Sequence, residues 1–400
     1  FDYGKEVKIM IKGIKLRLYP NTKQRDQLLQ MFGNDRFVWN IMLNMANERY
    51  KNNPSSSFVG EYGMDYLLKR LKQEYPFLKK SEARSLQISN HYLGQSFKML
   101  FKHQGGHPKF KSRKAIRQSY TGDGTNCKVL AKRYMRLPKI GSIKTSKTSR
   151  LEGLKIKRYT VSLEPTGKYY LSLMVDDPNI QSLEPTGAVV GIDMGVADLA
   201  ITSDGYKYPK FEANWYEQQA NKAQSKFSKR KHRALVRVRQ WNYNHKDIKQ
   251  DLSDYQNWQQ ARQTKARYQA KVANKRKDYL HKITTELVKS YDVIVIEDLK
   301  TKNLLKNHSL AKSITNNSWY LFREMLEYKC KWYGKELIKV SPNYTSQICS
   351  NCGYHSGKKP LEIREWTCPK CNTYHDRDIN ASINILNRGL KELKKVKARD

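Results

Sequence analysis

No stretch of about 18 consecutive apolar residues occurs in this 400-residue chain, and nothing in it resembles a secretory signal. We therefore expect neither a membrane-spanning helix nor export. Acidic residues are scarce as well, since 37 Asp and Glu stand against 76 Lys and Arg, for a net charge of +39. A chain with this excess repels itself unless a polyanion neutralises it. Nucleic acid is the favoured partner, and an anionic membrane surface is the alternative.

Cysteine is too rare for a disulfide framework, which favours a reducing compartment. Four of the six cysteines form two CxxC pairs, Cys349 with Cys352 and Cys368 with Cys371. The fifteen residues between the pairs are typical of a tetrahedral Zn²⁺ site with four thiolates, and a site closed by four protein ligands is structural. His355 and His375 lie near enough to replace a thiolate but are not needed. Cys127 and Cys330 are interpreted as small buried hydrophobic residues.

Three acidic residues occupy positions where an isolated carboxylate is costly. Asp193, in GIDMG, follows the apolar run 188–192, and Glu297 follows the apolar run 293–296 in YDVIVIEDL. Asp378 begins a predicted C-terminal helix in HDRDINASINIL. Taken singly, Asp193 and Glu297 fit equally well as turn residues at strand ends or as helix caps.

Together the three acids indicate a specific chemistry. If the two strands are neighbours in one sheet, Asp193 and Glu297 leave the same edge, and the helix at Asp378 can bring the third carboxylate. Three acids in one place repel each other unless divalent cations lie between them, and Mg²⁺ prefers oxygen ligands. Two such ions about 4 Å apart clamp the attacking water and the leaving oxygen of a phosphodiester. GIDMG also fits the start of an actin-like ATPase or sugar kinase, but we find no second phosphate-binding loop and no Gly-rich adenosine pocket.

Periodic patterns divide the chain into two regions joined near 181–187. Residues 12–20 predict a strand, and Asn21 with Gln24 predicts the capping box of a helix. Two further helices are expected over 61–102, split near Tyr75–Pro76. Several short strands are expected over 127–176, with PTG at 165–167 as a hairpin turn. We interpret this region as a small β-barrel interrupted by helices. The pattern after 188 is strand, strand, a long helical stretch to about 290, and the strand of 291–299.

Two segments concentrate positive charge and are candidates for nucleic-acid contact. Residues 103–124 are interpreted as a loop that tracks phosphates through Lys109, Lys111 and Arg113, with a merely solvated loop as the alternative. Residues 222–282 hold 18 Lys or Arg against 4 Asp, and Ala and Leu at helical spacing give this stretch one packing face. The basic side chains, Arg276 among them, suit a nucleic-acid backbone or else face solvent.

Six motifs in this order resemble the TnpB (OrfB) proteins of insertion sequences, relatives of the compact type V CRISPR nucleases. They are LRLYP, GHPKFKSRK, GIDMGVADLAITSDG, VIVIEDL, YTSQICSNCG and CPKCNTYHDRDINASINIL. The resemblance implies a multidomain α+β fold. Its parts are a β-barrel wedge domain over 10–20 and 103–180, a helical recognition domain over 21–102, a RuvC/RNase H-like nuclease domain over 188–343 and 374–392, and a zinc ribbon over 344–373. Met10 opens the match, so we expect residues 1–9 to be upstream sequence.

By the same resemblance, Asp193, Glu297 and Asp378 match the RuvC carboxylates that hold two Mg²⁺ ions, and the four CxxC cysteines match the ligands of one Zn²⁺. Asp378 rather than Asp376 is the match because it directly precedes Ile-Asn-Ala. The family reads its target by pairing with a guide RNA, while the protein reads only a short duplex motif beside it. Candidate readers are Tyr50, Ser81, Arg84, Ser85, Gln87 and Tyr120.

The expected function is therefore an RNA-guided, Mg²⁺-dependent DNA endonuclease of the prokaryotic cytoplasm. Its partners would be one guide RNA and double-stranded target DNA, with a monomer expected and a dimer left open. The alternatives are an RNA-guided DNA-binding regulator without cleavage, and an unguided RuvC-like nuclease or transposase. The complete triad disfavours the first, and the basic surface outside the nuclease domain disfavours the second. An insertion-sequence and a miniature CRISPR origin both remain open, as does the layout of the long stretch 234–262.

Overall fold

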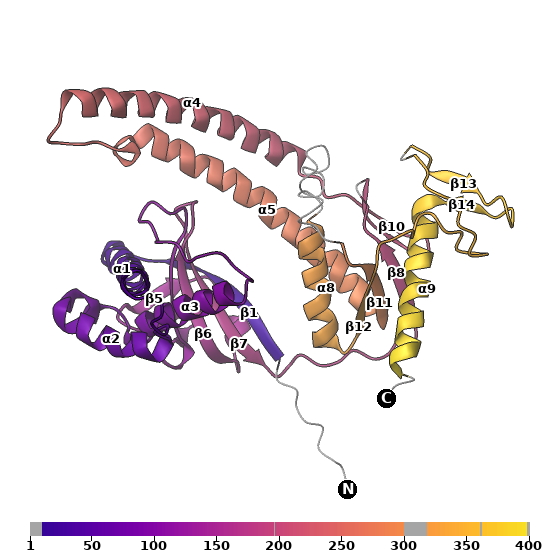
Figure 1. The fold of residues 1–400 in the computed structure, drawn as a ribbon, viewed down its shortest axis with the longest axis horizontal. Coiled ribbons are helices and arrows are strands. Elements are labelled where there is room, and N and C mark those ends of the chain that lie inside the picture. Colours follow the sequence, from indigo (N-terminus) through magenta and orange to yellow (C-terminus); the bar gives the residue numbers. More distant parts are fainter. Residues whose placement is uncertain (1–9, 196, 300–317, 361, 398–400) are drawn as a thin grey trace, which may run out of the picture. The chain divides into compact units, whose positions relative to one another are not determined.

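The computed structural model describes residues 10–195, 197–299, 318–360 and 362–397 (Figure 1). The chain forms two compact units. The first extends to Pro178 and includes Arg230–Arg267, and the second comprises Asn179–Lys229 and the residues from Tyr268 onward. The segment 1–9, predicted to be upstream sequence, lies outside the described residues. No helix in the described ranges combines the length and the apolar character needed to cross a membrane.

A seven-stranded antiparallel sheet forms the centre of the first unit, in the spatial order β2-β6-β7-β1-β5-β4-β3. The strands are β1 (Met10–Tyr19), β2 (Gln118–Asp123), β3 (Lys128–Ala131), β4 (Tyr134–Leu137), β5 (Gly141–Thr145), β6 (Lys155–Leu163) and β7 (Tyr169–Asp177). The strand predicted over 12–20 is confirmed, and buried Leu16 and Leu18 alternate in it with the accessible Lys15 and Arg17. The predicted hairpin at 165–167 joins β6 to β7. Among the described residues no pairing closes β2 onto β3, so the barrel stays a prediction.

Three helices interrupt this sheet between β1 and β2: α1 (Thr22–Asn52), α2 (Glu61–Glu74) and α3 (Ala83–Phe101). The predicted capping box is present, because Asn21 Oδ1 accepts from the Gln24 amide and Gln24 Oε1 accepts from the Asn21 amide. The predicted split near Tyr75–Pro76 is also confirmed, since a short 3₁₀ turn, Pro76–Lys80, separates α2 from α3. The helices share an apolar core of their own.

The second unit contains a five-stranded mixed sheet in the order β10-β9-β8-β11-β12. The strands are β8 (Val189–Asp193), β9 (Asp198–Thr202), β10 (Lys207–Pro209), β11 (Val293–Glu297) and β12 (Glu336–Val340). Strands β8, β11 and β12 are parallel, whereas β9 is antiparallel to β8. The strands predicted at 188–192 and 291–299 are therefore confirmed as β8 and β11. Their buried side chains, including Ile192 and Ile296, pack in one core with α5 (Gln256–Ser290) and α8 (Trp319–Tyr333).

The long basic stretch forms a helical hairpin of α4 (Asn214–Asn244) and α5 (Figure 1). The connection between the two helices, which the sequence left open, is held by side-chain bonds to its backbone. Asn242 Nδ2 donates to the Gln250 carbonyl at 3.0 Å, and Asn242 Oδ1 accepts from the Gln250 amide at 2.8 Å. Trp241 Nε1 donates to the Ile248 carbonyl at 2.9 Å. This part of the chain is thus an ordered turn with its own polar contacts.

A two-stranded sheet of β13 (Glu365–Thr367) and β14 (Tyr374–Asp376) precedes the C-terminal helix α9 (Arg377–Lys397). Glu365 lies opposite Asp376 in the ladder, so this sheet reaches the helix that carries Asp378. The zinc ribbon expected over 344–373 stays a prediction.

Candidate active site and four-cysteine centre

Parallel pairing of β8 and β11 brings Asp193 and Glu297 to one edge of the sheet. Ile192 lies opposite Ile296, so the next residue of each strand leaves the same carboxyl edge. The Thr345 hydroxyl donates a 2.7 Å hydrogen bond to Glu297 Oε1. This bond fixes one oxygen of Glu297. Sequence reasoning missed Thr345, which precedes the first CxxC pair and carries no pattern of its own.

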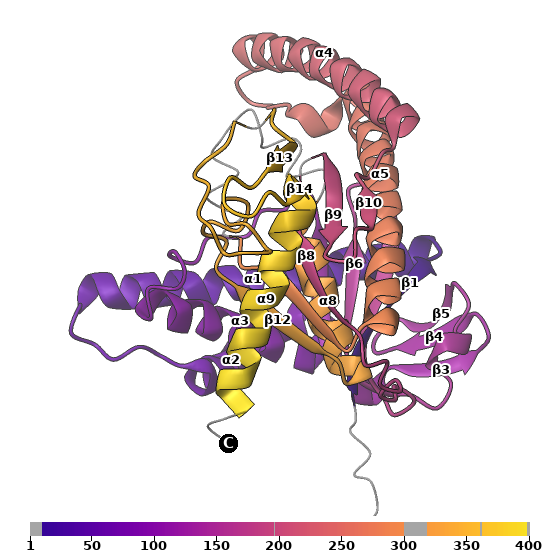
Figure 2. The same cartoon turned by 90° about the vertical axis from the view of Figure 1, so that its right-hand side faces the viewer.

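Helix α9 packs across the same sheet and carries Asp378 in its first turn (Figure 2). Gly191 permits this close contact, because a Cβ there would overlap the backbone carbonyl of Ser382. Gly389 does the same on the helix, because a Cβ there would overlap the side chain of Val295 on β11. The first glycine of GIDMG thus serves helix–sheet packing, and this packing sets where α9 presents Asp378.

Electrostatic interaction links the three carboxylates. Removal from water, together with the neighbouring charges of Glu297 and Asp378, raises the pKa of Asp193 to about 8. Removal from water also raises the pKa of Glu297, while the Thr345 hydrogen bond and the Arg388 charge oppose that rise. A cation that binds between carboxylates stabilises them, because it relieves their mutual repulsion. Oxygen donors of this kind fit a hard divalent ion such as Mg²⁺.

Asp376 and Asp378 have different roles although they are two positions apart. Asp376 Oδ1 accepts hydrogen bonds from the amides of Asp378 and Ile379, and its Oδ2 pairs with Lys207 Nζ at 2.7 Å. It therefore caps α9. Asp378 Oδ2 instead accepts a 3.3 Å bond from Arg364 of the ribbon. The charge of Asp378 is among those that raise the pKa of Asp193. The choice of Asp378 over Asp376 as the third carboxylate of the site stays a prediction.

The four CxxC cysteines converge, with their sulfur atoms all within 4.8 Å of one another. Cys349 Sγ lies 3.7 Å from Cys371 Sγ, and Cys352 Sγ lies 3.6 Å from Cys368 Sγ. Sulfurs placed about 2.3 Å from a tetrahedral Zn²⁺ are about 3.8 Å apart, so the observed spacing suits that ion. Across the described ranges this is the one group of three or more Cys, His, Asp or Glu ligands so close together. Asp193, Glu297 and Asp378 do not form such a group among the described residues.

Two asparagines of α9 hold the first CxxC loop beside the acidic edge. Asn380 Nδ2 donates to the Ile348 carbonyl, and Asn380 Oδ1 accepts from the Ser350 amide, both at 2.8 Å. Asn384 Nδ2 donates to the carbonyls of Thr345 and Ile348. Both asparagines belong to the sequence INASIN at 379–384, from which their function could not be predicted. They join the cysteine loop, Thr345 and Asp378 into one piece.

Three of the predicted nucleic-acid contacts lie in the protein interior. Ser81, Ser85 and Tyr120 each expose 2% or less of their surface. Ser85 Oγ donates to Asp35 Oδ2 at 3.1 Å, and Ser81 Oγ accepts from Asn34 Nδ2 at 2.8 Å. Ser85 joins α1 to α3, and Ser81 joins α1 to the turn before α3. Tyr120 on β2 packs against Phe32 of α1, with 5.8 Å between the ring centroids. These contacts correct the expectation that the three residues face a ligand. Sequence alone did not reveal this, because polar side chains such as Ser and Tyr suit both surfaces and buried positions.

The other predicted contacts on α1 and α3 are accessible. Arg84 and Gln87 lie one helical turn apart on α3 and share a 3.2 Å hydrogen bond, and Tyr50 on α1 is 67% exposed. Arg84 Nε also lies 4.0 Å from Asp123 Oδ2. An exposed arginine and amide on one helix face can reach base edges or phosphates. These three residues remain predictions.

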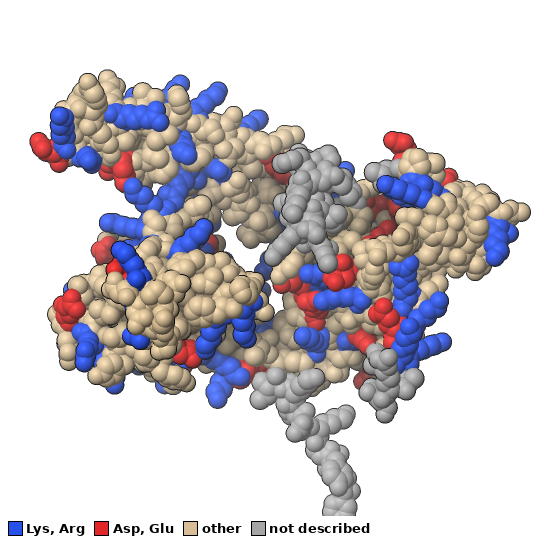
Figure 3. All heavy atoms as spheres, in the orientation of Figure 1, with Lys and Arg blue, Asp and Glu red and all other residues tan. Residues whose placement is uncertain are grey.

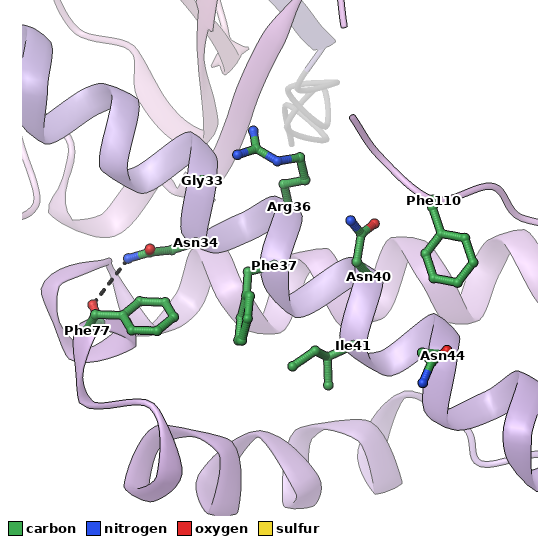
Figure 4. Close-up of a pocket in the computed structure, with 9 residues that line it drawn as sticks. All are labelled: Gly33, Asn34, Arg36, Phe37, Asn40, Ile41, Asn44, Phe77 and Phe110. Atoms are coloured by element: carbon green, nitrogen blue, oxygen red, sulfur yellow. Dashed lines mark hydrogen bonds between the residues drawn. The ribbon is translucent and has the colours of Figure 1, made fainter. Parts of the chain in front are cut away.

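The basic segment that contains Lys109, Lys111 and Arg113 is fastened to α1. Asn40 Nδ2 donates to the Lys111 carbonyl at 3.0 Å, Asn40 Oδ1 accepts from the Lys111 amide at 2.8 Å, and Trp39 Nε1 donates to the Lys109 carbonyl at 3.0 Å. Asn40 borders a hollow of about 480 Å³, in which Arg36, Asn40 and Asn44 follow one side of α1 (Figure 4). The segment is thus held by its backbone, and the accessible Lys109 and Arg113 side chains remain candidate contacts.

Positive charge follows one face of α4. Six of its basic residues fall within an arc of about 100° on a helical projection. They are Lys222, Lys226, Lys229, Arg230, Arg233 and Arg237. Lys and Arg side chains accordingly line the exposed edge of the hairpin (Figure 3). Arg276 on α5 is partly buried and lies over the Phe211 ring, 5.5 Å from its centroid, so packing accounts for part of its surface.

Fold and site together define a basic α/β protein with carboxylates at a sheet edge and an adjoining four-cysteine ribbon. Residues 172–308 match a family model described as "Probable transposase", and residues 319–385 match one described as "Cas12f1-like, TNB domain". Residues 10–54 match a "Helix-turn-helix domain" of the same OrfB proteins. In the structure that last segment is a strand followed by a single helix.

Relatives of the whole chain give the same assignment. A "Putative RNA-guided DNA endonuclease" of Streptomyces pristinaespiralis is 34% identical over 95% of this chain and 89% of its own length. A "Putative RNA-guided DNA endonuclease InsQ" of Escherichia coli is 29% identical over 95% and 92%. The solved mini-RNA-guided endonuclease CRISPR-Cas_phi3 has a similar fold, with a TM-score of 0.50, 10% identity, and coverage of 97% and 94%. The chain belongs to the TnpB (OrfB) family of insertion-sequence proteins.

Proposed function

We propose that this protein is an RNA-guided, Mg²⁺-dependent endonuclease that hydrolyses phosphodiester bonds of target DNA. The observation that carries the proposal is strand register, because β8 and β11 end side by side in Asp193 and Glu297. Identity of 34% over nearly the whole chain to a relative named for this activity supports it. The net charge of +39 supports it as well, since a guide RNA and a DNA target must be held together.

Asp193, Glu297 and Asp378 would hold two magnesium ions through their oxygens. When bound, these ions would activate a water and stabilise the charge that develops on the scissile phosphate. Thr345 would keep Glu297 oriented through its hydrogen bond. Arg364, which now pairs with Asp378, would be released from this carboxylate or drawn to a phosphate once a cation and a DNA strand are present.

The cysteine cluster would hold one structural Zn²⁺ and keep the ribbon beside the acidic edge. We further propose that the first sheet with its inserted helices forms the wedge and recognition domains, and that the second sheet is RuvC-like. Guide–target pairing would supply sequence recognition, and exposed residues such as Arg84, Gln87 and Tyr50 would read the short duplex motif.

The test compares Asp193→Ala with Asp298→Ala in the guide-loaded protein. Asp298 is the matched control because it follows Glu297 directly and its side chain is 55% exposed and paired with Arg323. We expect Asp193→Ala to abolish cleavage of a matching DNA in Mg²⁺ while target binding in EDTA is unchanged. Asp298→Ala should cut like the unmodified protein. Cleavage by Asp193→Ala would reject the site, and binding without cutting by the unmodified protein would favour a regulator.

A further inference from the structure

Aromatic and basic side chains gather where α4 begins beside α5, outside the carboxylate cluster. We call this group the aromatic–basic patch, and it consists of Trp215, Tyr216, Tyr268, Lys271 and Lys275. All five belong to the second unit. Trp215 is 56% exposed, which is high for the largest apolar side chain.

Contacts within the patch hold its tyrosines in place and leave the tryptophan accessible. Trp215 meets Tyr216 edge-on at 4.8 Å between ring centroids, and meets Tyr268 edge-on at 6.5 Å. Lys275 Nζ lies 4.7 Å from the Tyr216 centroid, and Lys271 Nζ lies 5.5 Å from Tyr216 and 5.6 Å from Tyr268. Cations over the rings fix two aromatic supports, so the exposed indole is a preformed stacking surface.

Strand register places this patch on the same side of the sheet as the carboxylates. Strand β9 runs antiparallel to β8, with Asp193 opposite Ile201, so its first residue Asp198 lies beyond the carboxyl edge of β8. Pro209, the last residue of β10, pairs with Asp198. The chain then reaches α4 within a few residues, and the Tyr279 hydroxyl of α5 donates to the Pro209 carbonyl at 2.6 Å. The patch therefore begins on the path that a DNA strand would take as it extends from the carboxylates beyond this edge of the sheet.

We infer that the aromatic–basic patch binds single-stranded DNA, namely the strand presented to the carboxylates for cutting, through base stacking on Trp215 and phosphate contacts to Lys271 and Lys275. A flat aromatic face flanked by lysines matches an unpaired base with its backbone, whereas a duplex hides its base faces. Two acids lie near the patch, and each has a basic neighbour outside it. Asp278 on α5 pairs with Lys282 at 2.9 Å, and Glu217 on α4 acts electrostatically on Arg276. The inference rests on the proposed function, since it assigns the strand that the site would cut.

The test measures binding without cutting, in EDTA, by fluorescence anisotropy of the full-length protein. The probes are oligothymidylate and oligouridylate of about 20 nucleotides and a DNA duplex of the same length. Trp215→Ala should weaken oligothymidylate binding at least about fivefold, the loss typical of one stacked base. Trp215→Phe should restore most of it, because a ring face returns. Tyr243→Ala, which removes an 85% exposed aromatic from the other end of α4, is the matched control and should bind normally.

Three results would overturn the inference. One is oligothymidylate affinity within twofold of normal for Trp215→Ala. Another is an equal loss on duplex, which would mean that Trp215 does not act by stacking on unpaired bases. The third is a loss confined to oligouridylate, which would assign the patch to RNA. A thermal melt of each variant guards against misfolding. Because the assay needs no cleavage, its failure leaves the Asp193→Ala test of the proposed function untouched, and the converse also holds.

Discussion

At the scale of single residues, Asp35 illustrates how a helix residue can acquire an unusual chemistry through its neighbours. It lies on α1 with 6% of its surface exposed, and its Oδ2 accepts a hydrogen bond from Ser85. Burial raises the pKa of Asp35 to about 7, and Glu82 adds to the rise while Ser85 and Lys111 oppose it. The carboxyl is therefore largely protonated in the folded protein below neutral pH.

Asp35 should make the protein less stable as the pH rises. Its pKa is about 4 in an unfolded chain, so from about pH 4 to about pH 7 the unfolded state binds fewer protons than the folded state. The contribution of Asp35 to the free energy of unfolding must fall over this window. Asp35→Asn removes this titration. Between about pH 5 and pH 8 its free energy of unfolding should rise by about 3 kcal/mol relative to that of the unmodified protein. Urea unfolding at several pH values measures this.

Asp26→Asn is the control for that experiment, because Asp26 lies exposed on the same helix. The change with pH measured for Asp35→Asn is compared with that of this variant. A constant difference for Asp35→Asn would contradict the assigned environment of Asp35.

At the scale of elements, the ribbon and α9 depend on each other. Asn380 and Asn384 bond the backbone of the first CxxC loop, and the second strand of the ribbon runs directly into α9. Among the described residues, the apolar cluster around these sulfurs is small, since it consists of the four cysteines and Trp366. A metal ion would therefore contribute most of the ribbon's folding free energy.

Cys352→Ser should consequently lose the zinc and unfold the ribbon, while the three larger cores persist. Metal analysis of the purified protein should fall from about one zinc per chain to almost none. Cys330→Ala, which changes a buried cysteine outside the cluster, should keep the zinc. Equal zinc content in the two variants would reject the four-thiolate ligand set.

At the scale of the whole molecule, charge dominates. A surplus of 39 positive charges makes any nucleic-acid complex sensitive to salt, because binding releases the counterions of the phosphates. The six basic residues on one face of α4, which we call the stripe, concentrate part of this charge. The sequence left open whether that face contacts a nucleic-acid backbone or solvent. The two cases differ in how steeply the affinity for DNA falls with salt concentration.

Neutralising three residues of the stripe, with Lys222→Gln, Lys226→Gln and Arg233→Gln combined, should lower the steepness of log affinity against log salt by about 3. Guide-loaded protein and target DNA would be titrated between about 50 and about 200 mM NaCl. The matched control removes three exposed lysines of α9, Lys391, Lys394 and Lys395, with the same loss of charge. Identical slopes for the two variants would mean that the stripe only faces solvent.

The sequence predicted those features that depend on local pattern or on fixed spacing. The capping box of α1, the turn at 165–167 and strands β8 and β11 are encoded by neighbouring residues, and the convergence of the cysteines is encoded by two CxxC pairs. It misjudged Ser81, Ser85 and Tyr120, because their burial depends on how α1 packs against α3 and β2. It also gave no sign of Thr345, Asn380 or Asn384, whose partners are distant in the chain.

By itself, then, the sequence determined the family, the charge and the identity of the acids and thiols, because these reside in residue type and order. Only the tertiary structure decided that Asp193 and Glu297 end side by side, since parallel register is set by strands more than 90 residues apart. It also decided that Gly191 admits α9, and that aromatic residues of α4 and α5 meet beside that edge. Contacts of this kind come from packing, which no local pattern encodes.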